Sequence, residues 1–311
     1  MSVANLTLPM FIGSIFNWAL FSILLAQAYI YFSVFPKDRT WWKLIVVLIV
    51  FLEVVETASS TRDMVHIFGA GWGNLDALDD VGWAWFSVPV MGAIISFVCQ
   101  TFYGWRIHVI GHSPFMTFMF VLIVLVSFVE LGAGIWTGVE ICIAGKFSVL
   151  QSSNLTATAT WLAGMCAADL LIIFGTIFSL RQSTDSEFTS TRTNSVVSRV
   201  IRLTAETGGL CMAFVLVDIY LFASYKGTNY HLAVCIELSK IYSNSILLIF
   251  NSRAHMGHGC SINTDDYSGV NMSSSLFSRS KRSTASAPIE IGVRVSRSDA
   301  NSDFGGKRMD C

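Results

Sequence analysis

Seven apolar segments, each long enough to cross a bilayer as a helix, dominate this sequence of 311 residues. About 20 predominantly apolar residues are needed for a crossing, and the helix satisfies its own backbone groups in lipid. Only 13% of the residues are charged, against roughly 25% in soluble domains. We therefore expect an all-α integral membrane protein, a seven-helix bundle, with spans at residues 11–35, 43–67, 83–105, 115–138, 158–180, 203–225 and 230–250.

Lysine and arginine are distributed unequally between alternate loops, and positive residues are retained on the cytoplasmic side. The ends of the first, third and fifth spans carry eight of them, whereas the opposite loops carry only Arg62, Lys146 and Lys226. This bias predicts an outside N-terminus and a cytoplasmic C-terminus. Asn5 and Asn154 lie in sequons on the predicted outer side and are candidate glycosylation sites.

The composition changes after residue 251, where the apolar periodicity ends. Residues 252–311 contain 13 serines and many arginines, a composition typical of disordered chain. We expect a seven-span domain at residues 1–251 followed by a disordered cytoplasmic tail at residues 252–311. Ser280 and Ser283 lie in a basic run of this tail and are candidate phosphorylation sites.

Several charged residues fall inside the predicted spans, where burying a charge costs several kcal/mol unless it is paired or hydrated. Glu237 precedes Lys240 by three residues, a spacing that permits an ion pair within one helix. The pattern predicts one outward-facing polar cavity that binds a ligand or relays protons, and interhelical packing by protonated carboxyls is the alternative. The candidate cavity residues are Glu56, Glu130, Asp169, Asp218, Glu237 and Lys240.

Several seven-helix chemistries can be compared with this spacing. A retinal Schiff base would use a lysine of the seventh span, which Lys240 supplies, but the third span, residues 83–105, contains no carboxylate as counter-ion. The histidines lie at span ends or in loops, which does not suit intramembrane zinc hydrolysis. We expect no cofactor, no metal and no enzymatic activity, and the net charge of −1 gives no field for nucleic acid.

Four stretches carry a resemblance to a known family, and they lie at residues 31–38, 100–107, 198–208 and 238–253. They resemble a fungal, basidiomycete-expanded family of seven-span membrane proteins, domain of unknown function 6534. The positions that match its motifs include Gln100, Arg106, Lys240, Tyr242, Asn244, Asn251 and Arg253. The resemblance implies that Lys240 holds the helices together, and it implies no activity or ligand.

The chain departs from the family pattern in the second span. Glu53 and Glu56 stand where the resemblance leads us to expect an aspartate and then a histidine.

Three functional hypotheses follow. The first is a receptor-like or sensory protein that binds an unknown small molecule in the outer cavity and signals to a cytoplasmic partner through its tail. The alternative is a transporter or proton-coupled carrier that uses the mid-membrane carboxylates, and a membrane enzyme is third. The expected surroundings are the lipid bilayer of the plasma membrane or an endomembrane.

Overall fold

The computed structural model describes residues 3–71, 73–74, 80–111, 113–146, 156–184, 191–225 and 230–253. Apart from one isolated β-bridge between Asp80 and Lys146, regular structure in these ranges is helical. The helices are α1 (Val3–Val34), α2 (Thr40–Val65), α4 (Met91–Gly111), α5 (Pro114–Ala144), α7 (Thr156–Thr184), α8 (Thr191–Ser224) and α9 (Tyr230–Ser252). Two π-helical turns, η1 (His66–Ala70) and η2 (Phe86–Val90), extend α2 and precede α4.

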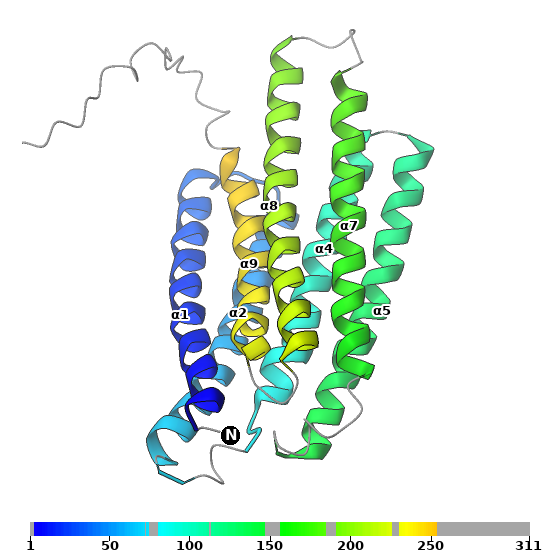
Figure 1. Cartoon of the computed structure of the whole chain (residues 1–311). Helices are drawn as coiled ribbons and strands as arrows, with labels where there is room; N and C mark the ends of the chain where they lie inside the picture. The colour runs from blue at the N-terminus through cyan, green and yellow to red at the C-terminus, as the bar shows by residue number, and fades with distance from the viewer. Residues whose placement is uncertain are drawn as a thin grey trace, which may run out of the picture. The chain divides into compact units, whose positions relative to one another are not determined.

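Seven of the described helical segments are long and apolar enough to cross a membrane. This confirms the all-helical class and the number of candidate spans. Successive helices run in alternate directions, as Figure 1 shows. We call the end that holds residues 35–39 and Arg253 the inner end, after the predicted orientation, and the opposite end, where α1 begins, the outer end.

The helix termini follow from local sequence. Pro114 stands in the first turn of α5, where its missing N–H costs nothing. Gly145 ends the same helix with a φ of 65°, a left-handed conformation that favours glycine. The third predicted span begins differently from the expectation: Pro89 lies within η2, and α4 begins only at residue 91.

Asp63 joins α2 to the start of the third span at the outer end. Its two carboxylate oxygens accept hydrogen bonds from the backbone N–H of Trp83 at 3.0 and 2.9 Å. Arg62 donates to the same carboxylate at 3.2 Å and lies 4.6 Å from the Trp83 ring centroid. Gly82 has a φ of +55°, and an added Cβ would lie 2.8 Å from Asp63 Oδ1.

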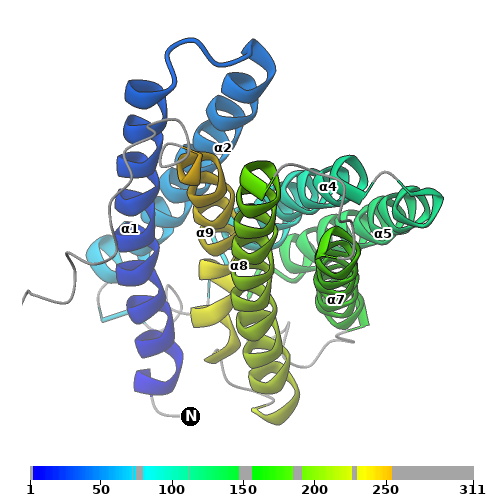
Figure 2. The ribbon, with the colours of Figure 1, turned by 90° about the horizontal axis from the view of Figure 1, so that it is seen from above.

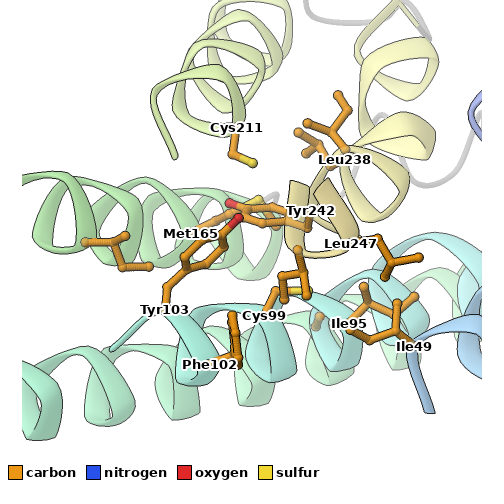
Figure 3. Close-up of a cluster of buried hydrophobic side chains, with 14 of the residues drawn as sticks. Ile49, Ile95, Cys99, Phe102, Tyr103, Met165, Cys211, Leu238, Tyr242 and Leu247 are labelled. Atoms are coloured by element: carbon orange, nitrogen blue, oxygen red, sulfur yellow. The ribbon is translucent and has the colours of Figure 1, made fainter. Parts of the chain in front are cut away.

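Helix α9 is the most enclosed of the seven candidate spans. It packs against α1, α8, α4 and α2, and Figure 2 shows it between α1 and the group formed by α4, α5 and α7. Its apolar contacts are drawn in Figure 3, where Tyr242 and Leu247 of α9 lie among Cys99 of α4, Met165 of α7 and Cys211 of α8.

The surfaces that face away from these contacts are apolar. Phe118 and Phe128 of α5 and Phe51 of α2 are each more than half exposed. Large exposed apolar patches on soluble monomers are rare, whereas helices that face lipid require them. The arrangement suggests a multi-pass protein embedded in a lipid bilayer.

Candidate functional site

Lys240 lies at the centre of a buried polar cluster formed by α1, α2 and α9. Its Nζ donates to Glu53 and to Glu56 of α2. Ser243 of α9 donates to the other Glu53 oxygen at 2.5 Å. Asn17 of α1 donates to the two Glu56 oxygens at 3.2 and 3.3 Å. We call these five residues the Lys240 cluster.

The charged members of this cluster are shielded from solvent. Lys240 and Glu53 are 0% exposed and Glu56 is 1% exposed. The Lys240 ammonium also lies 5.8 Å from the ring centroid of Phe21 in α1. Ionised groups are stable at such depth only when they are paired and hydrogen-bonded, and every charged member here has both kinds of partner.

Glu237 adds a third carboxylate near the same lysine. It is 5% exposed and lies on α9 three residues before Lys240, and its charge interacts with Lys240 and with Glu53 and Glu56. Lys240 nevertheless forms its ion pairs across helices, with α2, rather than with Glu237. One ammonium therefore faces three carboxyl groups, so neutrality at this point requires added protons or cations.

Two further predicted residues contact other helices. Asp169 of α7 accepts a hydrogen bond of 2.5 Å from the Tyr242 hydroxyl of α9. Glu130 of α5 accepts one of 2.5 Å from Ser96 of α4. An added Cβ at Gly164 of α7 would lie 3.2 Å from the Glu130 Cβ, which shows how closely α7 approaches this carboxylate.

Asp218 of α8, the sixth predicted residue, faces α9 near the outer end. Its Oδ1 lies 3.8 Å from Nδ1 of His231, the second residue of α9. The six predicted residues thus lie at contacts between several helix pairs, and α9 takes part in those of Glu56, Lys240, Asp169 and Asp218. That the six residues line one shared cavity stays a prediction.

Arg253 fixes the inner end of α9 to the first loop. Its Nη2 donates to Asp38 at 2.6 Å, and the Tyr31 hydroxyl of α1 donates to the same oxygen at 2.9 Å. The Arg253 guanidinium also lies 5.0 and 5.3 Å from the ring centroids of Phe35 and Phe250. We call Tyr31, Asp38 and Arg253 the inner latch.

The charge of Asp38 is favoured by its surroundings. Burial raises the pKa of Asp38, but hydrogen bonds from Arg253, Tyr31 and the backbone N–H of Arg39 outweigh burial and hold this pKa below 3.8, its ordinary value. Asp38 is therefore ionised at neutral pH and keeps its ion pair with Arg253.

Two asparagines of α9 bind the backbone of α1. Asn244 Nδ2 donates to the carbonyl of Leu20 at 3.1 Å and to that of Lys240 at 2.8 Å. Asn251 Nδ2 donates to the carbonyl of Gln27 at 2.9 Å. The donors and the acceptors are both seven residues apart, so α1 and α9 run side by side in a heptad register.

The remaining motif positions lie on α4. Gln100 accepts a hydrogen bond of 2.6 Å from Ser127 of α5. Arg106 is 9% exposed and lines a small pocket near the inner end with Thr176 and Ser179 of α7 and Thr204 of α8. The motif residues thus lie at helix contacts.

Sequence reasoning left three members of the Lys240 cluster out of the candidate site. Glu53 was visible as a charged residue of the second span, and Ser243 appeared only as part of the motif stretch 238–253. Asn17 carried no signal because polar uncharged residues are common in spans. The predicted sites Asn154, Ser280 and Ser283 lie outside the described residues, and so does the side chain of Asn5. Among the described residues, no cluster of three or more metal-ligating side chains is found.

Comparison with known proteins gives one match. Residues 165–255 match the model of a family of unknown function, DUF6534. The matched region holds Asp169, Asp218, Lys240 and Arg253, so it includes the α9 residues of the Lys240 cluster and Arg253 of the inner latch. No curated protein and no solved structure matches the chain.

Proposed function

We propose that the protein is a receptor-like or sensory membrane protein in which α9 carries a signal from the Lys240 cluster to the inner end. The observation that carries this proposal is that one enclosed helix holds Lys240, in contact with α2, and is followed directly by Arg253, in contact with Asp38. The proposal includes the predicted orientation, with the N-terminus outside and the tail cytoplasmic.

The cluster has the properties of a switch. Lys240 is shared between two glutamates on one neighbouring helix, so a change of charge beside it alters the attraction between α9 and α2. Buried ion pairs respond strongly to the loss of one partner, which costs about 3–5 kcal/mol. Because α9 is bound to α1 through Asn244 and Asn251, a displacement at mid-depth is transmitted along the helix toward Arg253.

The tail and the family likeness extend the proposal. The tail that follows Arg253 would contact a cytoplasmic signalling partner, with Ser280 and Ser283 as modification sites. The resemblance at residues 31–38 and 100–107 supports extending the family likeness beyond the matched residues 165–255 to the full seven-span region.

A ligand screen by thermal shift tests the proposal on the purified full-length protein in detergent. Lipids, sterols, amines and metal ions are added one at a time, because a ligand that binds only the folded state raises the unfolding midpoint. We expect at least one class to raise the midpoint of the wild type and not that of Lys240→Met. Lys43→Met is the matched control, since the Lys43 ammonium binds the Pro36 carbonyl in the first loop.

The proposal is contradicted if no class shifts the wild type, or if a ligand shifts wild type and Lys240→Met equally. In the first case the cluster is a packing device, and in the second the ligand binds elsewhere.

A proton-coupled carrier is the second candidate, favoured by the carboxyl groups buried beside hydroxyl donors. Glu130 and Asp169 are 0% and 2% exposed and meet Ser96 and Tyr242 rather than a cation. A pH gradient imposed on proteoliposomes should then drive a flux that Asp169→Asn abolishes. If that variant folds and no pH-dependent flux is found in wild type, these carboxyl groups act in packing alone.

A further inference from the structure

The outer ends of α8 and α9 bring an acid and a base together at an unusual distance. Asp218 Oδ1 and His231 Nδ1 are 3.8 Å apart, which is too long for a hydrogen bond but close enough for strong attraction between opposite charges. His231 Nδ1 has no hydrogen-bond partner among the described residues, and the Asp218 carboxylate has none there apart from the weak donor of the Cys235 thiol on α9. Buried polar groups without partners are rare in folded proteins and call for an explanation.

The two side chains differ in their access to water. Asp218 is 0% exposed, whereas the His231 side chain keeps 22% of its surface exposed. His231 is the second residue of α9, and Asp218 lies six residues before the end of α8, roughly 9 Å along the helix. The Phe222 ring of α8 packs edge-on against the imidazole, with centroids 5.4 Å apart. A proton from the outer side therefore reaches the histidine before the aspartate.

Few other titratable groups face this pair. Cys235, one turn after His231, interacts through its thiol with Asp218. Tyr225 and Tyr230 meet edge-on at the same end of the two helices, with ring centroids 5.6 Å apart. Among the described parts of α1, α2, α4 and α7, no charged side chain forms an ion pair or hydrogen bond with either member.

We propose that Asp218 and His231 form a proton-binding site at the outer end, in which uptake of one proton by the imidazole closes the gap to an ion pair. The proton comes from water on the outer side and binds the imidazole nitrogen, and no other bond forms or breaks. Charged N–H to carboxylate hydrogen bonds have lengths of about 2.7–2.9 Å, so the two side chains approach by about 1 Å.

Histidine suits this role because its ordinary titration falls between about pH 5 and 8. Protonation changes the attraction between α8 and α9 without any ligand-sized cavity. Lys240 lies nine residues, or roughly 13 Å, further along α9, so the site would make external pH an input to the Lys240 cluster. That role rests on the proposed receptor function, whereas proton binding itself does not.

A double-mutant cycle tests the site on the full chain in detergent. The unfolding midpoints of wild type, Asp218→Asn, His231→Gln and the double variant are measured in steps from about pH 4 to about pH 8.5, a range that extends well beyond the ordinary histidine titration on both sides. We expect the coupling between the two positions to amount to about 2–4 °C at the acidic end of this range, and to vanish at the alkaline end, where the imidazole is neutral. The cycle removes effects that each substitution has alone.

The control cycle uses two α9 asparagines that donate to backbone carbonyls of α1, Asn244→Ala with Asn251→Ala, because neither bond involves a titrating side chain. Its coupling should be equal at every pH. Coupling between Asp218 and His231 that is absent at every pH, or equal throughout the range, overturns the proposal.

Two results keep the proton site and the receptor function distinguishable. If Asp218→Asn does not fold, His231→Gln decides alone: the midpoint difference between the two ends of the pH range must shrink relative to wild type, and an unchanged difference refutes the site. A normal cycle together with ligand shifts that Lys240→Met leaves intact would support the proton site and contradict the receptor mechanism.

Discussion

Replacing Lys240 by methionine should lower the free energy of unfolding by about 3–5 kcal/mol, the cost of removing one partner from a buried ion pair. Methionine has a similar length and shape to the lysine stem, so little packing is lost. Glu53 and Glu56, 0% and 1% exposed, would keep their charges or take up protons without a cation between them. For a folded region of this size the loss corresponds to a midpoint lower by roughly 6–20 °C.

The measurement is thermal unfolding of purified protein at neutral pH, compared between three variants. Lys240→Met alone should show the full loss. Adding Glu53→Gln and Glu56→Gln should recover most of it, because the amides carry no charge and still accept hydrogen bonds from Ser243 and Asn17. If the triple variant is as unstable as the single one, charge is not the cause and the electrostatic reasoning is refuted.

Three other expectations concern packing and pH. Gly134→Ala should lower the free energy of unfolding by about 1–3 kcal/mol, because its Cβ would lie 2.4 Å from an α4 side chain. Gly132→Ala, where the added Cβ meets open space, should leave the thermal unfolding midpoint unchanged or raise it. Equal effects of the two substitutions would contradict the close approach of α5 to α4. Asn244→Ala should cost about 1 kcal/mol by loss of its bond to α1, and an unchanged midpoint would show that this bond contributes nothing. The pKa of Asp38 lies below its ordinary 3.8, so the ion pair with Arg253 stabilises the fold above that pH, and this stabilisation disappears as pH falls through the lowered pKa. The stability difference between wild type and Asp38→Asn, at most about 1 kcal/mol, should therefore persist in thermal melts from neutral pH to about pH 4 and fade below. A difference that stays constant at all pH values would contradict this.

The seven helices could be predicted because span length and apolar content are local properties of the chain. The start of the third span could not be placed from apolar content alone, since Pro89 and the bond from Trp83 to Asp63 set it. Gly132 and Gly134 are equivalent in sequence, yet only Gly134 faces the next helix closely. Such differences depend on which neighbour a helix face meets.

The candidate site was likewise predictable only as far as local sequence determines it. Lys240 was predicted as its basic residue, and the spacing to Glu237 permitted a pair within α9. The actual partners are 187 and 184 residues away in the chain, because α2 packs against α9. A partner chosen by helix packing leaves no local pattern, which is why Glu53 was left out of the predicted cavity residues.

The pairing of α1 with α9 has a consequence for biosynthesis. The asparagines that donate to the carbonyls of Leu20 and Gln27 lie 224 residues later in the chain. Lys240, the cation that pairs with Glu53 and Glu56, is likewise synthesised long after both glutamates. During synthesis α2 must therefore enter the membrane with two glutamates whose cation, Lys240, is supplied only by the last helix. A chain that stops before residue 240 leaves both glutamates without a cation, so insertion of α9 is the step that completes the charge balance of α2.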